Sequence, residues 1–172
     1  MPTHPRSARS RRALTMVDTM MAVALLAVLA LVAIPAVGPD QPLRVISAAT
    51  VLASDIEFAQ SASLASPSDP VVVRFDPDGG RYWLARASSP DAPIDRPGRH
   101  PVAPYVVEFG AADALYLAGV GATTQNIPDG VLAFDAFGRL DQMGDARVTL
   151  ANTSGSATVQ ISASTGSVAL VP

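Results

Sequence analysis

The chain has 172 residues, of which 49% are apolar and 16% are charged, and it contains no cysteine and no lysine. The absence of cysteine excludes disulfide bonds, thiolate metal sites and cysteine nucleophiles. Four of the 12 arginines lie in the first 12 residues, and the rest of the chain carries 8 arginines against 15 acidic residues, a formal charge of −7. This balance argues against wholesale binding to nucleic acid or anionic lipid.

Residues 1–13 form a basic leader, MPTHPRSARSRRA, without any acidic residue. Its four arginines are Arg6, Arg9, Arg11 and Arg12. The run Thr19–Gly38 has 20 uncharged residues, which at about 1.5 Å rise per residue is enough to cross the roughly 30 Å core of a bilayer. Only Arg44 follows closely, so the positive-inside rule predicts a single membrane span with a cytoplasmic N-terminus and an exported remainder.

The start of this apolar run carries a more specific pattern. Ala13-Leu14-Thr15-Met16-Val17-Asp18 resembles the type III signal of type IV pilins and pseudopilins. In that signal a small residue precedes the cut, a hydrophobic residue follows it, and an acid is fifth in the mature chain. The resemblance implies that a prepilin peptidase cleaves between Ala13 and Leu14, and that the new amine of Leu14 is methylated.

Two further positions bear on this resemblance. Pro35 would be residue 22 of the mature chain, where pilins commonly carry a proline, and a proline is tolerated as a kink in a lipid-embedded helix. The family usually has glycine in place of Ala13 and glutamate in place of Asp18, so this chain departs from the pattern at both. We predict roles in processing for Ala13 and Leu14, and roles in assembly for Asp18 and Pro35.

Two other interpretations of the N-terminal segment stay open. A plain membrane anchor accommodates Asp18 if the carboxylate reaches the lipid headgroups. A secretory signal peptide also has a basic start and an apolar run, but its cleavage site would fall near residues 33–38. The small-x-small pattern is poor there and Pro35 obstructs it.

A second helix is predicted over residues 39–66. This segment opens with Pro39-Asp40-Gln41-Pro42, which ends the preceding helix, and Asp40 is a candidate N-cap for the new one. Apolar residues recur at spacings of four and three up to about Ala65, as on one face of a helix. They are Val45, Ala49, Leu52, Ile56 and Ala59, and the residues off this stripe include Arg44, Ser47, Ser54, Asp55, Glu57 and Gln60. We expect the stripe to pack on its own domain, with neighbouring subunits as the alternative partner.

Residues 67–172 change to a strand-like pattern. Val71–Phe75 and Arg81–Ala85 flank Asp76-Pro77-Asp78-Gly79-Gly80, which predicts a β-hairpin whose glycines supply positive φ. A calcium loop is the weaker interpretation, because further oxygen ligands are missing at a recognised spacing. Tyr82 and Trp83 are expected to fill or cover the sheet.

Further strands are predicted at residues 105–109, 114–117, 131–134, 147–151, 157–161 and 167–171, and an irregular, proline-rich surface loop at 87–104. Alternation of apolar and polar residues is clearest around Val148 and Leu150 and around Val159 and Ile161. The expected fold is therefore α+β: a long N-terminal helix, its first half (14–38) in the membrane, packed on a small antiparallel β domain.

Candidate catalytic and ligand-binding residues are few. After the leader only His100 remains as a histidine, and no Ser-His-acid, paired-carboxylate or metal-ligand spacing is recognisable. Arg96, Arg99 and His100 form a small basic cluster beside Asp91 and Asp95, which is better explained as a solvated loop than as a nucleic-acid site. We expect neither enzymatic activity nor a cofactor or metal.

The C-terminal half adds to the family resemblance. The strand and turn order of residues 131–139, 148–150, 159–161 and 165–168 resembles that of the GspH/FimT minor pseudopilins. The resemblance implies a subunit of a type II secretion or type IV pilus-like filament in the inner membrane, with prepilin peptidase and other pilins as partners. In this family the acid at the position of Asp18 pairs with the N-terminal amine of a neighbouring subunit.

DNA is a disfavoured partner on the same comparison. Some FimT-type members bind DNA through a C-terminal Gly-Arg-x-Arg turn, but the matching residues here are Gly166-Ser167-Val168-Ala169 and carry neither arginine. A DNA-binding competence pilin and a membrane-anchored exported binding domain without a filament remain the alternatives to a structural minor pseudopilin.

Overall fold

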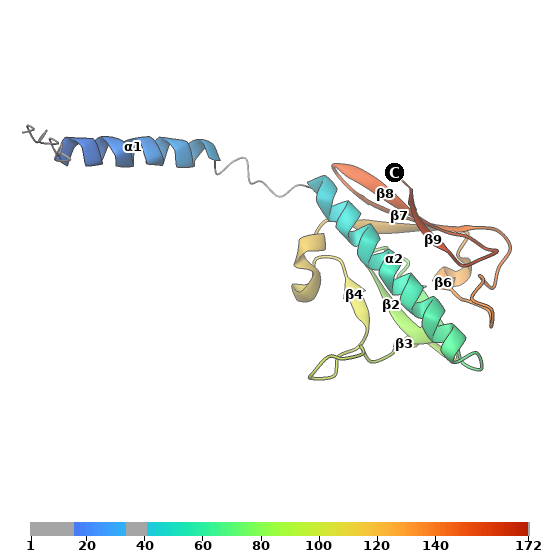
Figure 1. Ribbon diagram of the computed structural model, residues 1–172. Helices are drawn as coiled ribbons and strands as arrows, with labels where there is room; N and C mark the ends of the chain where they lie inside the picture. The colour runs from blue at the N-terminus through green and yellow to red at the C-terminus, as the bar shows by residue number, and fades with distance from the viewer. Residues whose placement is uncertain (1–15, 34–40, 172) are drawn as a thin grey trace, which may run out of the picture. The chain divides into compact units, whose positions relative to one another are not determined.

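The computed structural model describes residues 16–33 and 41–171 (Figure 1). These residues belong to two compact units, one within residues 1–39 and one within residues 40–172. The first unit contributes a single helix, and the second contains a helix and two β-sheets around one core.

The helix of the first unit, α1, spans Met16–Ala33. It covers most of the expected 14–38 helix, but Ala13, Leu14 and Pro35 lie outside the described residues. Within the described part of the chain, no helix has both the length and the apolar character needed to cross a bilayer. Residues 34–38 of the span expected over Thr19–Gly38 lie outside the described residues.

The helix of the second unit, α2, spans Gln41–Ala65, within the predicted range. The predicted stripe is confirmed, because each of its residues is at most 1% exposed: Val45, Ala49, Leu52, Ile56 and Ala59. Pro67 prevents continuation of the helix beyond Ser66, since proline lacks the N–H that a further helical turn needs. The expected N-cap, Asp40, lies outside the described residues.

Ser63 joins the end of α2 to the first strand. Its hydroxyl is fully buried, lies 2.8 Å from the carbonyl oxygen of Ala59 and 2.9 Å from that of Val71, and accepts the N–H of Val71 at 3.1 Å. A buried hydroxyl needs such partners to offset its lost hydration. The contact fixes where the chain turns from helix to sheet.

The strands form two antiparallel sheets. The first contains β1 (Val71–Phe75), β2 (Arg81–Arg86), β3 (Ser89–Pro93), β4 (Val106–Glu108) and β6 (Val131–Leu132), in the order β3-β2-β1-β6 with β4 also beside β2. The second contains β5 (Gly121–Gln125), β7 (Ala146–Asn152), β8 (Gly155–Ile161) and β9 (Val168–Val171), in the order β5-β7-β8-β9. The predicted hairpin at residues 71–85 is confirmed, with Val73 opposite Leu84.

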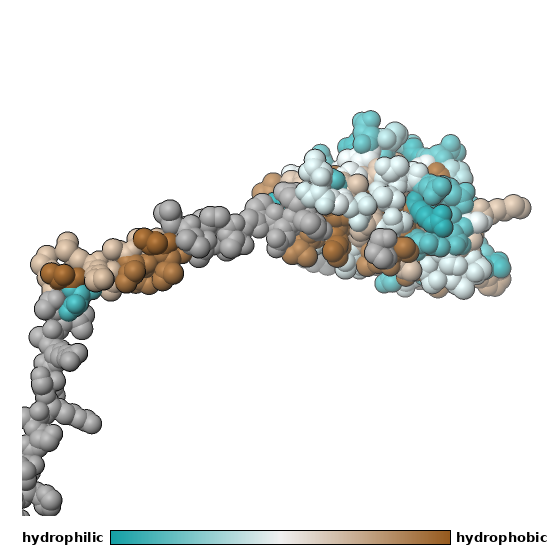
Figure 2. Space-filling model, turned by 90° about the horizontal axis from the view of Figure 1, so that it is seen from above, coloured by the Kyte–Doolittle hydropathy of each residue, from teal (hydrophilic) through white to brown (hydrophobic). Residues whose placement is uncertain are grey.

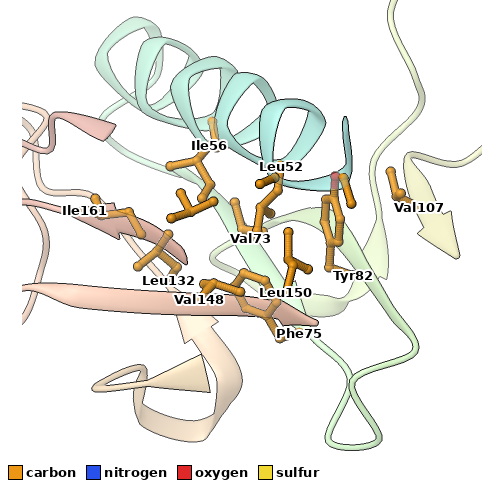
Figure 3. Close-up of a cluster of buried hydrophobic side chains, with 14 of the residues drawn as sticks. Leu52, Ile56, Val73, Phe75, Tyr82, Val107, Leu132, Val148, Leu150 and Ile161 are labelled. Atoms are coloured by element: carbon orange, nitrogen blue, oxygen red, sulfur yellow. The ribbon is translucent and has the colours of Figure 1, made fainter. Parts of the chain in front are cut away.

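The core lies where α2 packs against both sheets. Figure 3 shows Leu52 and Ile56 of α2 directed toward Val73 and Tyr82 of the first sheet and Val148 of the second. The predicted alternation in β7 and β8 is confirmed, because the apolar members are fully buried and their neighbours face outward: Val148, Leu150, Val159 and Ile161 are buried, while Arg147, Thr149, Thr158 and Gln160 are exposed or half-buried. The expected α+β class, a helix packed on antiparallel sheets, is thus confirmed.

Two local predictions are wrong, and one strand was missed. The strand predicted at 114–117 lies instead in a 3-10 helix, η2 (Ala112–Leu117). A strand would place Leu115 and Leu117 on the same face, whereas Leu115 is 66% exposed and Leu117 is fully buried. The irregular loop at 87–104 contains the short strand β3, and β5 was not predicted at all. Both lack the runs of large apolar residues that mark strands, and are held by pairing to β2 and β7.

The remaining differences are small. A second 3-10 helix, η3 (Pro128–Gly130), precedes β6, which is two residues long instead of the predicted four. Tyr82 fills the core as expected, at 1% exposure. Trp83 is half-buried, and its indole N–H donates to the carbonyl oxygen of Pro90 at 2.9 Å, which holds β3 beside β2.

Candidate assembly surfaces and a buried polar cluster

The first candidate surface is α1. Its large apolar side chains from Met16 to Leu29 are all 57–77% exposed and occur on every side of the helix: Met16, Val17, Met20, Met21, Val23, Leu25, Leu26, Val28 and Leu29. Figure 2 shows apolar side chains along α1 in brown. A helix that is apolar all round is stable only in apolar surroundings. The helix therefore needs a hydrophobic environment that its own side chains do not provide.

Asp18, the predicted assembly residue, lies in the first turn of α1. A carboxylate there is favoured by the positive end of the helix dipole. The other predicted site residues, Ala13, Leu14 and Pro35, are outside the described residues, so their roles stay predictions.

The second candidate surface is the outward face of α2, opposite the buried stripe. Its exposed residues between 43 and 65 are small or apolar apart from Glu57: Leu43, Ile46, Ser47, Thr50, Ser54, Phe58, Ser61, Leu64 and Ala65. A helix face that only meets water normally carries several charges. A single charge across six turns indicates a face that can lie against another apolar or small-residue surface.

The buried side of α2 also carries a polar cluster that the sequence did not reveal. Asp55 is 8% exposed, although it lies off the predicted apolar stripe. Its two carboxylate oxygens accept hydrogen bonds from the hydroxyls of Tyr82 at 2.7 Å and Tyr105 at 2.8 Å. The guanidinium of Arg96 lies over the Tyr105 ring at 4.7 Å, and its Nη2 donates to the carbonyl oxygen of Val106. Asp55 thus ties α2 to β2 and to the chain entering β4.

Burial dominates the electrostatics of this cluster. It raises the pKa of Asp55 above its usual value, and the two tyrosine hydrogen bonds and the Arg96 charge oppose the rise only in part. Burial, followed by the interactions with Asp55, raises the pKa of Tyr105 to about 12 and that of Tyr82 well above its ordinary range. Both tyrosines stay protonated donors over the physiological pH range, which suits a structural hydrogen-bond cluster.

A cavity of about 260 Å³ adjoins the cluster, with Asp55, Arg96, Tyr105 and Glu108 among its lining residues. The Nε of Arg96 is buried without a hydrogen-bond partner in the structure. Both signs of charge line the cavity, so its electrostatics favour no particular class of ligand. Among the described residues, no group of three or more histidine, aspartate and glutamate side chains is placed to hold a metal ion.

The turn that matches the DNA-binding turn of FimT-type proteins connects β8 to β9. Gly166 has φ +67°, and a Cβ there would lie 2.0 Å from the carbonyl oxygen of Gly138 and 2.3 Å from Nε2 of Gln60. The same Gln60 nitrogen donates to the carbonyl oxygens of Gly138 and Thr165. The turn is therefore held against the domain by an uncharged contact, and Val168 and Ala169 belong to β9 instead of forming a basic loop.

Comparison with solved structures gives the class of fold first: a helix laid across antiparallel sheets of this topology is a pilin-like fold. One protein with this fold that the chain resembles is the type IV minor pilin FimU of Pseudomonas aeruginosa strain PAO1. One crystal form has a TM-score of 0.52 and 19% sequence identity, and the match covers 74% of this chain and 88% of that chain. A second crystal form gives 0.49 and 18%, covering 73% and 91%.

No protein-family model matches the sequence, and no curated protein matches it. At 19% identity the structural likeness shows the fold alone.

Asp55 is the residue that sequence reasoning placed wrongly. It is next to Ile56 and three residues after Leu52, so it lies at the border of the buried stripe and not on the opposite face. Tyr82 was a partial signal, because it lies in the predicted hairpin and buried carboxylates are expected only where hydroxyl or cationic donors are available. Nothing in the sequence marked Tyr105 as one of those donors.

Proposed function

We propose that this chain is a minor pilin or minor pseudopilin, a non-enzymatic subunit of a type IV pilus-like or type II secretion filament. The observation that carries the proposal is the combination of a pilin-like domain with a preceding helix, α1, whose apolar side chains are exposed on all sides. A filament made of packed N-terminal helices supplies the apolar surroundings that such a helix needs. The outward face of α2, with Glu57 as its one charge, suits contact with neighbouring subunits.

The proposed maturation begins at the cytoplasmic side of the inner membrane, with the globular unit exported. Prepilin peptidase cleaves between Ala13 and Leu14, and the amine of Leu14 is methylated. The carboxylate of Asp18 then pairs with the Leu14 amine of a neighbouring subunit. Two charges that are each costly in apolar surroundings offset one another only when both partners are present. The pairing therefore sets the axial register of the helices as they enter the filament.

Incorporation into sheared filaments tests this mechanism. We expect Asp18→Ala to be cleaved normally but to be absent from the filament fraction of the native host, because the Leu14 amine of its neighbour loses its partner. Asp18→Glu, which supplies the residue usual in the family, is the matched control and should be incorporated. Normal incorporation of Asp18→Ala would remove the proposed pairing.

A further inference from the structure

Exposed sheet edges invite pairing with other chains, and most edges of this domain are protected. β3 has the sequence Ser-Pro-Asp-Ala-Pro, in which Pro90 and Pro93 lack backbone donors and Asp91 is exposed. β6 has only two residues. In β4 the carbonyl oxygen of Val106 already accepts a hydrogen bond from Arg96. These features leave little continuous backbone for another strand.

The β5 edge of the second sheet is also covered. The N–H of Ala122, which points away from β7, donates to the carbonyl oxygen of Gly79 at 2.8 Å. The turn containing Gly79 packs closely against β5, because a Cβ added to that glycine would lie 2.2 Å from the carbonyl oxygen of Ala122. The hairpin of the first sheet therefore occupies the place where another strand would pair.

The opposite edge, β9, has none of these features. Val168–Val171 contains four apolar residues, with no charge and no proline, and Leu170 and Val171 are 49% and 40% exposed. Figure 1 shows β9 leading to the C-terminus marked on the second sheet. Among the described residues, none hydrogen-bonds to the backbone of β9 from the side away from β8.

The register shows which groups of β9 are free. Ser162 donates to the carbonyl oxygen of Ser167 at the turn, and from there Gln160 is opposite Ala169 and Thr158 opposite Val171. Hydrogen-bonded pairs alternate in an antiparallel ladder, so the backbone of Ala169 and Val171 faces β8. The N–H and C=O groups of Val168 and Leu170 therefore point outward.

We propose that β9 is an interaction edge that pairs antiparallel with β9 of a second copy of this chain. A row of free N–H and C=O groups is matched by another extended backbone. In a pair related by a two-fold axis, each residue near the axis lies close to the same residue of the other copy. A charged residue there would lie close to a like charge, so a strand without charges is well suited to pair with itself. β9 meets that condition over its whole length, in a domain that is otherwise acidic.

The outward groups also fix the register of the pair. The backbone of Val168 in one copy hydrogen-bonds to the backbone of Leu170 in the other, and the reverse pair forms as well. This register places the two-fold axis at Ala169. The two Ala169 residues then form a non-hydrogen-bonded pair with Cα atoms about 4.5 Å apart. This separation is within the range that a disulfide spans, roughly 4.4–6.8 Å. Leu170, on the face of the sheet that packs on the core, becomes covered by the partner strand.

Cysteine cross-linking of the full chain in membranes or detergent tests the pairing, because the native chain has no cysteine. Ala169→Cys should form a disulfide-linked dimer under mild oxidation. Thr123→Cys is the matched control: it lies mid-strand on the covered β5 edge, its backbone likewise faces inward, and its side chain is exposed on the same sheet face. Thr123→Cys reports any background association through α1.

A second substitution separates pairing from simple proximity. Leu170→Pro, combined with Ala169→Cys, removes an N–H that the β8–β9 ladder does not use. We expect the dimer to be lost while thermal unfolding stays unchanged, and Leu170→Ala, which keeps the N–H, to retain it. Equal cross-linking of Ala169→Cys and Thr123→Cys, or a dimer insensitive to Leu170→Pro, would overturn the proposal. So would a disulfide formed only with a different filament subunit that carries a cysteine.

Discussion

The two helices of this chain are both rich in apolar residues, yet they use them in opposite ways. In α2 a helical stripe of apolar residues is at most 1% exposed, and Leu52 and Ile56 in it form part of the core. In α1 they surround the helix and are 57–77% exposed. The difference teaches that the stability of α2 is provided by its own domain, whereas α1 depends on apolar surroundings from outside its own unit.

The largest expected effect comes from truncating one leucine in each helix. Leu52→Ala should lower the free energy of unfolding by about 2–5 kcal/mol, because it leaves a cavity under α2. Leu25→Ala in α1 should leave it unchanged. Urea unfolding of the full chain in detergent, followed by fluorescence of Trp83, the single tryptophan, reports on the domain in both variants. Equal destabilisation by the two substitutions would contradict the comparison.

The next effect concerns the polar cluster on the buried side of α2. Asp55→Ala should destabilise the domain by about 1–3 kcal/mol, since the buried hydroxyl of Tyr82 and the half-buried hydroxyl of Tyr105 lose their acceptor. Ser54→Ala, one residue earlier on the exposed face, is the matched control and should be close to neutral. A neutral Asp55→Ala would show that the cluster does not hold α2 to the sheet.

A smaller effect is expected from the ionisation of Asp55. Its pKa is raised in the folded state, so folding favours the protonated carboxyl. The stability gained from this preference is present at low pH and is lost as the pH rises through the folded pKa. Relative to Asp55→Asn, which does not titrate, the wild-type domain should therefore become more stable as the pH is lowered through this range. Parallel stability curves for the two proteins would argue against a raised pKa.

The smallest effect on stability, with a large one on assembly, is expected on the outward face of α2. Ser54→Arg should change the free energy of unfolding by less than about 0.5 kcal/mol but reduce incorporation into sheared filaments, because it places a charge in the proposed subunit contact. Thr153→Arg, in the exposed turn between β7 and β8, is the control and should assemble normally. Unimpaired assembly of Ser54→Arg would exclude this face from the filament contact.

Sequence patterns predicted those parts of the fold that depend on neighbouring residues or on a regular spacing of apolar residues. The stripe of α2, the turn at residues 76–80 and the alternation in β7 and β8 each have a physical cause visible in a few neighbouring residues. The misplaced elements depend on partners distant in sequence. β5 is a strand because it pairs with β7, and Asp55 is buried because Tyr105, 50 residues later, supplies a donor. No local pattern encodes such a pairing.

The proposed processing residues Ala13 and Leu14 and the proposed assembly residue Pro35 are a different case, since they were inferred from a resemblance and lie outside the described residues. The fold is pilin-like, and the large apolar side chains of α1 are exposed on every side of the helix.

Mass spectrometry of the N-terminus, on protein from the native host with and without active prepilin peptidase, tests this account most directly. We expect a mature chain beginning at Leu14, with a methylated amine, only when the peptidase is active. An intact leader in the presence of active peptidase, or cleavage near Ala36, would contradict it and leave an anchored or secreted β domain in place of a filament subunit.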